Sequence, residues 1–416
     1  MVRIKGFKGI RPKKELASRI ASPPYDVLNS NEARIAVKIE PYSFLHVVKS
    51  EVDLPPETDQ YDPAVYQKAA DNLSDMRKDK LIQDQKPVMY IYRQVLDERA
   101  QIGLIAVQHI DDYLEGKVKI HELTREDKEK DRITHIDVVN AHTGPVFYTY
   151  PDDKNIDKLI ADSMDKNPEY DYTSKDGVHH TLWLLEDQNT IDSLIGRFEK
   201  IDHVYVADGH HRSKASAMVG KRRRDANPKH TGNEEYNWFL AVFFPAKQLK
   251  IIDYNRVVRD LNGLSKKEFL SKMKKIFKVK KISSSEFAKP TEEHEFGMYL
   301  LDHWYQLTLK KELLDLSDPV KSLDSALLTE LVLKPILSIK DIRKDKRIDF
   351  VGGSRGMEAL EGRVNAGEMA LAFALNPITI KQLMDVADSN ALMPPKTTWF
   401  EPKLQSGLFI HSLEDK

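Results

Sequence analysis

The stretch Val204–Ala215 constrains the fold more than any other part of the chain. It begins with Val204–Ala207, an apolar run of β-branched and aromatic residues that is typical of a buried strand. Asp208-Gly209 then interrupts this run, and from Arg212 onward the apolar residues recur at helical spacing. The sequence therefore predicts a strand, a tight glycine turn and the start of a helix.

The predicted turn carries a dense set of polar side chains. Asp208, His210, His211 and Arg212 surround Gly209 within five consecutive residues. At the start of a helix, free backbone N–H groups and the helix dipole favour an anion. We infer that this turn binds a phosphoryl group and takes part in its transfer. The alternative is a solvated turn in which Asp208 only caps the helix.

The composition is that of a soluble globular protein with no general attraction for nucleic acid. The 416 residues include 64 Lys and Arg and 65 Asp and Glu, which gives a formal net charge of −1. The absence of cysteine excludes disulfides and thiolate chemistry. The first residues form no apolar leader, and no apolar run approaches the length of a membrane span. We expect a cytoplasmic protein that does not enter a membrane; its oligomeric state is not indicated.

The order of the predicted elements indicates a mixed α and β fold. Helices and strands alternate from about residue 155 to 220, which is an α/β signature. We predict an N-terminal α/β catalytic region, 1–245, that contains the Asp208 turn. A C-terminal α+β region, 246–416, is expected to contribute a proline-rich loop to the same site. Two further elements are predicted from apolar patterns, a strand at Ser43–Val48 and a helix at Leu323–Leu337.

A second polar group stands just before another predicted helix. Thr124, with an acid three residues later, resembles a capping box and predicts a helix after it. Lys128 and Arg132 are four residues apart and would share one helix face. His121 and Glu122 precede the helix, where an anion-binding site would lie. The alternative is an exposed, ion-paired helix.

Two segments stiffened by proline present further polar side chains. In Ser22–Asp26, two prolines restrict the backbone before Tyr25 and Asp26. Three prolines restrict Met393–Leu408, so its polar side chains lie on an ordered loop that suits phosphate binding. The alternative for this second segment is a structural strap. Its candidate phosphate ligands are Lys396, Thr397, Thr398 and Lys403.

Several common motifs are absent from the sequence. It contains no P-loop, no dinucleotide-binding glycine motif, no protein-kinase signature and no zincin motif. A phosphoryl-transfer enzyme with this sequence would therefore not be of the P-loop or protein-kinase type. Asp208, His210 and His211 are residue types that bind metals, but no further spaced ligand accompanies them, so we expect no structural metal.

The polar blocks occur together, in this order, in a known family. They are Ser22–Asp26, the residues 121–132, Ala207–Arg212, Tyr254–Val258 and Met393–Lys403. On these blocks the chain resembles the family known as domain of unknown function ten-fifteen, from about Gly6 to the C-terminus. Its Asp-Gly-His-His-Arg and Met-Pro-Pro-Lys blocks are the most specific. The first of these is also similar to the corresponding block of free-serine kinases related to the ParB/sulfiredoxin superfamily.

The resemblance implies an α+β fold with a ParB/sulfiredoxin-like catalytic core and a kinase that converts free L-serine to O-phospho-L-serine. It implies inorganic pyrophosphate as the donor, with a nucleotide as the other candidate, and Mg²⁺ is expected because phosphoryl transfer usually needs it. The acceptor hydroxyl needs a base, for which Glu122 is the first choice and Asp208 the second. The other expected catalytic residues are His121 and His210. The expected substrate and phosphate ligands are Tyr25, Asp26, Lys128, Arg132, Gly209, His211, Arg212, Arg256, Lys396, Thr398 and Lys403.

Two other functions stay open at this point. A ParB-like regulator that binds nucleic acid or nucleotides would show a continuous basic face and salt-sensitive DNA binding. The even charge balance argues against such a face. A phosphohydrolase would use the same residues with water as the acceptor, and the sequence does not separate it from a kinase.

Overall fold

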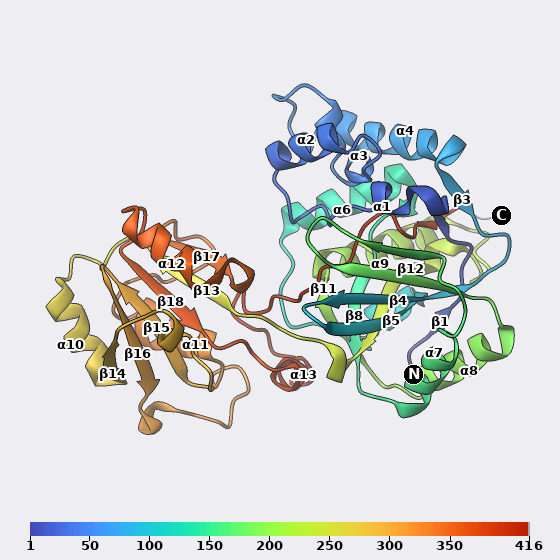
Figure 1. The fold of residues 1–416 in the computed structure, drawn as a ribbon. Helices are drawn as coiled ribbons and strands as arrows, with labels where there is room; N and C mark the ends of the chain where they lie inside the picture. Colours follow the sequence, from blue (N-terminus) through green and yellow to red (C-terminus); the bar gives the residue numbers. More distant parts are fainter. Residues whose placement is uncertain (415–416) are drawn as a thin grey trace. The chain divides into compact units, whose positions relative to one another are not determined.

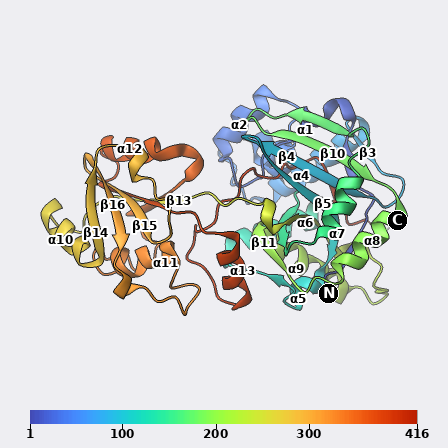
Figure 2. The same cartoon turned by 60° about the horizontal axis from the view of Figure 1, so that its bottom comes forward.

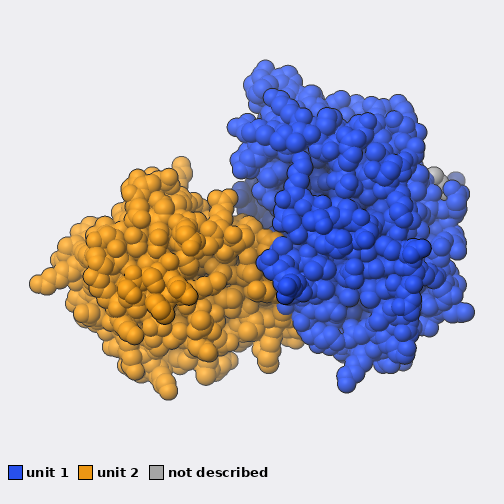
Figure 3. All heavy atoms as spheres, in the orientation of Figure 1, with its two compact units in different colours: residues 1–249, 402–416 blue, residues 250–401 orange. Residues whose placement is uncertain are grey.

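The computed structural model describes residues 1–414, which divide into two compact units (Figures 1 and 3). The first unit comprises residues 1–249 and the segment that begins at Pro402; the second comprises Lys250–Glu401. The predicted mixed α and β class is confirmed. Because the chain returns to the first unit at Pro402, Lys403 belongs to the unit that holds the Asp208 turn, whereas Lys396 belongs to the other.

The first unit is built on a mixed sheet with the strand order β6-β11-β8-β12-β5-β4-β10-β9 and with β1 beside β5. Strand β11 is parallel to β6 and antiparallel to β8, while β12 is parallel to β8. Two short ladders, β2-β3 and β7-β19, lie outside this sheet. The strands of the unit are β1 (Ile4–Lys5), β2 (Ile10–Pro12), β3 (Leu81–Gln83), β4 (Met89–Leu96), β5 (Arg99–His109), β6 (Val118–Lys119), β7 (Ala141–His142), β8 (Val146–Tyr150), β9 (Tyr170–Thr173), β10 (His179–Leu185), β11 (Val204–Asp208), β12 (Trp238–Pro245) and β19 (His411–Ser412).

Helices of the first unit cover this sheet and form a second apolar cluster beside it (Figures 1 and 2). They are α1 (Ala17–Ile20), α2 (Ser30–Ile39), α3 (Leu45–Val48), α4 (Pro63–Asp79), α5 (Ile110–Leu114), α6 (Glu126–Val139), α7 (Lys154–Asp162), α8 (Gln188–Phe198) and α9 (His210–Ala226). Helix α9 packs on α6, and α6 packs on α4. No helix within residues 1–414 is long and apolar enough to cross a bilayer.

The second unit contains an antiparallel sheet with the order β14-β16-β15-β18-β13-β17. Phe269, Phe277 and Phe296 lie in its main apolar core. Its elements are β13 (Tyr254–Val258), α10 (Lys266–Ile276), β14 (Phe277–Ile282), β15 (Glu295–Leu300), β16 (His303–Leu309), α11 (Asp324–Leu328), β17 (Ile348–Gly352), α12 (Gly356–Asn365), β18 (Leu371–Leu375) and α13 (Ile380–Asp388).

Three sequence predictions of local structure are corrected. The predicted strand Ser43–Val48 is wrong, because Leu45–Val48 forms helix α3 and packs its apolar side chains into the cluster shared with α2 and α4. The predicted capping box at Thr124 is also wrong. Helix α6 begins with Arg125 at the N-cap, with no capping side chain, and Asp127 pairs with Arg125 at 2.7 Å.

The third correction concerns the predicted helix Leu323–Leu337. The α-helix α11 ends at Leu328, and the next residues, Thr329–Leu333, form a π-helical turn. The wider spacing still buries Val332 and Leu333 in the core of the second unit. The apolar pattern was thus correctly assigned to a helical segment, but it did not indicate the change of helix type.

Helix α9 lies close to neighbouring backbone at Gly220, which yields a stability prediction. A Cβ atom at Gly220 would lie 2.2 Å from the carbonyl oxygen of Tyr236 and 2.9 Å from Ile110 Cδ1. We therefore expect Gly220→Ala to lower the free energy of unfolding by about 1–3 kcal/mol, as overpacking does. Urea denaturation followed by circular dichroism measures this difference.

Gly196 in α8 is the matched control, because within residues 1–414 a Cβ built there has no atom within 4 Å outside its chain neighbours and its own helix backbone. Gly196→Ala should be neutral or should stabilise by up to about 1 kcal/mol, since alanine favours helix. Equal unfolding midpoints for the two variants would show that α9 tolerates a side chain at Gly220.

Candidate functional site

The Asp208 turn joins β11 to α9, as the sequence predicted. Strand β11 ends at Asp208, Gly209 has a φ of 94°, and α9 begins at His210. A Cβ on Gly209 would lie 3.1 Å from Arg212 Nε. Glycine is therefore favoured both by the left-handed backbone conformation and by the guanidinium group that folds back onto the turn.

Asp208 is held by two cations. Its Oδ2 lies 3.0 Å from Arg212 Nη2, and its Oδ1 lies 3.6 Å from Lys403 Nζ. Burial alone would raise the pKa of Asp208, but the charges of Lys403 and Arg212 lower it to about 2. Asp208 is therefore ionised at neutral pH and is a weak base. Arg212 also donates a hydrogen bond from Nη1 to the carbonyl oxygen of Pro145.

The histidines near the turn hold the loop that follows β6. His121 donates its backbone N–H to His210 Nε2 at 3.5 Å, and the two rings are perpendicular with centroids 4.4 Å apart. Arg125 donates its backbone N–H to His211 Nε2 at 3.0 Å. Burial lowers the pKa of His210 to about 4 and that of His121 well below the usual value. Both rings are therefore neutral at neutral pH. Glu122 is half-buried in the same loop.

Helix α6 contributes a buried arginine to the site. Arg132 pairs with its neighbour Asp131 at 2.9 Å, and its guanidinium lies over the ring of Tyr25, 4.0 Å from the centroid. Burial raises the pKa of Tyr25, which keeps its hydroxyl protonated. Lys128, one turn earlier on the helix, instead donates to the Tyr61 hydroxyl at 2.9 Å. Asp26 is exposed.

Three of the predicted ligands line one small cavity. Tyr25, Arg132 and Arg212 contribute to the wall of a cavity of about 30 Å³, together with His142 and Ser216. This volume accommodates one or two water-sized groups. Sequence reasoning missed His142 and Ser216. The only local signal for His142 was its position two residues before the Gly144-Pro145 turn, which is a weak one.

The remaining predicted ligands belong to the second unit. Arg256 is 1% exposed, donates to the carbonyl oxygen of Tyr254 and lies 5.4 Å from the Phe350 ring centroid. Burial lowers the pKa of Arg256 to about 10. Lys396 is exposed, and its ammonium lies 5.6 Å from the Tyr254 ring centroid. Thr398 is half-buried on the same loop. The roles assigned to these three residues stay predictions.

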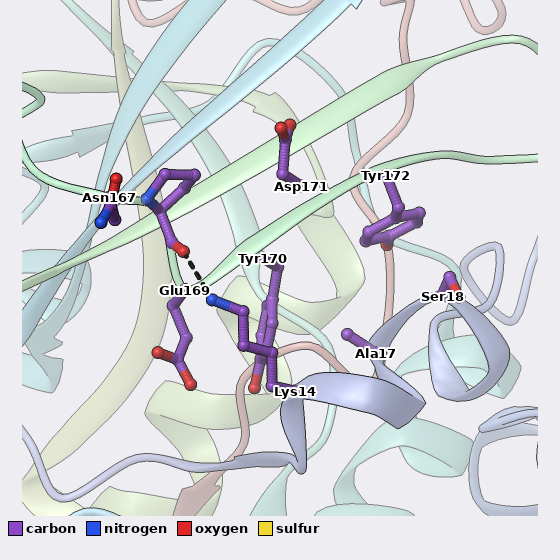
Figure 4. Close-up of a pocket in the computed structure, with 9 residues that line it drawn as sticks. Lys14, Ala17, Ser18, Asn167, Glu169, Tyr170, Asp171 and Tyr172 are labelled. Atoms are coloured by element: carbon purple, nitrogen blue, oxygen red, sulfur yellow. Dashed lines mark hydrogen bonds between the residues drawn. The ribbon is translucent and has the colours of Figure 1, made fainter.

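A larger cavity of about 420 Å³ lies elsewhere in the first unit, between the start of α1 and strand β9 (Figure 4). None of the predicted site residues lines it. Lys14 points across it toward the carbonyl oxygen of Pro168, at 3.0 Å. Glu169 on its wall is paired with Arg11 at 2.7 Å. Its wall carries one cation, Lys14, and two carboxylates, Glu169 and Asp171, so this cavity is a weaker candidate for an anion.

No group of three or more His, Asp or Glu side chains that could hold a metal ion occurs in residues 1–414. Asp208 does not fit as a preformed ligand, since both its oxygens face cations. Mg²⁺ usually binds through one or two carboxylates and substrate phosphates and keeps several waters. Mg²⁺ would therefore need phosphate oxygens of the donor as ligands, and its use by this protein stays a prediction.

Several solved structures are distantly similar to this chain. A conserved hypothetical protein from Pyrococcus furiosus is 14% identical, with a TM-score of 0.33, and the match covers 74% of this chain and 95% of that one. Free serine kinase in complex with AMP is 14% identical, with a TM-score of 0.34 and coverages of 74% and 92%. SbnI with a C-terminal truncation, from Staphylococcus aureus, is 12% identical, with a TM-score of 0.38 and coverages of 73% and 87%. At TM-scores this low, these likenesses assign no activity.

A search among curated proteins gives no match. The comparison with family models gives a match over most of the chain. Residues 4–326 match the model described as "Protein of unknown function (DUF1015)", which is most of the chain. The expected family is therefore confirmed, and this protein belongs to the DUF1015 family.

Proposed function

We propose that this protein is a phosphotransferase that phosphorylates the hydroxyl of free L-serine, with inorganic pyrophosphate as the donor. The observation that carries the proposal is the cavity beside the Asp208 turn, whose wall includes the buried guanidinium groups of Arg132 and Arg212. Buried cations beside a helix start suit a phosphoryl group. The resemblance of the Asp-Gly-His-His-Arg block to that of free-serine kinases suggests the acceptor.

In the proposed reaction, the serine oxygen forms a bond to one phosphorus atom of pyrophosphate. The bond from that phosphorus to the bridging oxygen breaks, and inorganic phosphate leaves. The serine proton passes to a base. Arg132, Arg212 and Lys403 would hold the donor, and Mg²⁺, entering with the donor, would neutralise part of its charge. The small cavity has no room for a nucleoside, and only the end of a pyrophosphate would enter it. We therefore propose pyrophosphate as the donor, and we place the reaction in the cytoplasm.

The direct test is a product assay with the purified full-length protein. L-serine is incubated with Mg²⁺ and with pyrophosphate, ADP or ATP, and products are identified by ³¹P NMR and mass spectrometry. We expect O-phosphoserine with pyrophosphate and its loss when Mg²⁺ is chelated. Phosphate released at the same rate without serine would indicate a phosphohydrolase. No reaction together with salt-sensitive DNA binding would favour the ParB-like regulator.

Arg212 and Lys403 are expected to bind the donor. Replacing Arg212 or Lys403 by alanine removes a charge-assisted hydrogen bond and should weaken pyrophosphate binding about 10- to 100-fold in calorimetric titration. Arg212→Lys should also be impaired, because lysine cannot reproduce the planar fork.

Lys221→Ala is the control for this experiment, since Lys221 is exposed on the same helix and pairs with Asp225 four residues later. It should bind pyrophosphate like the wild type. Melting temperatures separate lost binding from lost folding. Wild-type affinity in both the Arg212 and Lys403 variants at moderate salt would disprove the assignment.

Glu122 is our proposed base, with Asp208 as a positioning group. The low pKa of Asp208 and its two cationic partners support this division. Glu122→Gln keeps shape and hydrogen bonding but removes basicity, so kcat should fall by roughly 10²- to 10⁴-fold, with KM for serine nearly unchanged. Steady-state kinetics with varied serine measures both.

The matched control is Glu126→Gln, which removes an exposed carboxylate from the first turn of α6 and should leave kcat unchanged. If Asp208→Asn lowers kcat alone while Glu122→Gln mainly raises KM, then Asp208 is the base and Glu122 is the positioning group.

A further inference from the structure

Two histidines that are far apart in the sequence meet beside the small cavity. His142 in β7 lies directly opposite His411 in β19 in a short antiparallel ladder. Directly opposed residues of such a ladder place their side chains next to each other. The two rings are nearly parallel, with centroids 5.4 Å apart and their Nδ1 atoms 3.1 Å apart. His142 is 4% exposed and His411 2% exposed.

The partners of this pair determine which nitrogen carries a proton. Burial lowers the pKa of both histidines, so each ring is neutral and has one N–H. His411 Nε2 lies 2.8 Å from Glu235 Oε2, and an ionised carboxylate only accepts, so this nitrogen carries the proton. His411 Nδ1 must then accept from His142 Nδ1–H. The other ring nitrogen of His142, Nε2, is left with a lone pair.

This lone pair belongs to a side chain that lines the cavity. His142 Nε2 is buried and has no hydrogen-bond partner among the described residues. Arg212 Nε is likewise a buried donor without a partner within residues 1–414, and Arg212 lines the same cavity. Buried polar atoms without partners are rare in folded proteins. The cavity wall therefore includes cationic donors and the neutral acceptor of His142, together with His135 and the hydroxyls of Ser216 and Ser406.

We propose that His142 Nε2 accepts a hydrogen bond from a protonated phosphoryl oxygen whose other oxygens are bound by Arg132 and Arg212. The cavity then selects hydrogen phosphate groups over fully ionised oxyanions. Sulfate has the same shape but no proton to donate, so it would face the His142 lone pair with an anionic oxygen. The inference deepens the proposed function, because it takes this cavity to be the phosphoryl site.

The test compares inorganic phosphate and sulfate as ligands of the purified full chain, by calorimetric titration at neutral pH. A buried acceptor left unsatisfied should make sulfate bind about 10- to 100-fold more weakly than phosphate. His142→Asn places an amide where Nδ1–H stood, so it can still donate to His411, but it has no atom at the Nε2 position. This variant should lose most of the preference while it still binds sulfate.

His179→Asn is the matched control, because this partly exposed histidine on β10 pairs with Asp171 and does not line the cavity. It should keep the wild-type preference. A folded His142→Asn variant that retains the full preference would overturn the inference. So would equal binding of the two anions by the wild type, although the proposed kinase would survive both results. Failure of the wild type to bind either anion would instead remove the proposed phosphoryl site as a whole.

A second measurement tests the inference even if His142→Asn does not fold. In protein labelled with ¹⁵N-histidine, the chemical shifts distinguish protonated from unprotonated ring nitrogens. We expect Nε2 of His142 to be unprotonated without ligand and to change its shift when phosphate, but not sulfate, is added. Glu235→Gln removes the carboxylate that fixes the tautomer and should reduce the preference for phosphate. A protonated His142 Nε2 in the wild type would contradict the inference.

Discussion

The ion pair between Asp208 and Arg212 is the interaction on which the rest of the site depends. One helical turn separates the two residues, and Gly209 between them leaves room for the guanidinium to fold back. Arg212 also donates to the carbonyl oxygen of Pro145, which fixes α9 to the loop before β8. Lys403 approaches Asp208 from the C-terminal segment. The Asp208 turn, the loop before β8 and the C-terminal segment are therefore held together by the contacts of Asp208 and Arg212.

The site combines paired cations with neutral histidine rings. Arg132 pairs with Asp131, and both Arg212 and Lys403 lie beside Asp208. The neighbouring histidines are neutral because burial lowers their pKa. Arg132 and Arg212 are buried, and a buried cation is costly unless it is paired with an anion. Such fixed cations need no reorganisation when a phosphoryl group is transferred, which is how preorganised sites lower barriers.

The sequence predicted what local spacing determines. The strand, glycine turn and helix around Asp208 follow from residue periodicity, and Arg132 and Tyr25 were identified from their own short segments. The stacking of the Arg132 guanidinium over the Tyr25 ring was not predictable, because the two residues are far apart in the sequence. His142 and His411 lie 269 residues apart, each in a two-residue strand, so no local pattern indicates that they meet. The apolar run Ser43–Val48 suited either a strand or a helix, and packing against α2 and α4 decided for the helix.

A crystal structure with methylenediphosphonate, a pyrophosphate analogue that cannot be split at its bridge, tests the central claim most directly. The account predicts that phosphoryl oxygens occupy the small cavity and contact Arg132 and Arg212, with Asp208 still paired to Arg212. An analogue bound instead in the cavity beside Lys14 and β9, with Arg132 and Arg212 untouched, would contradict it.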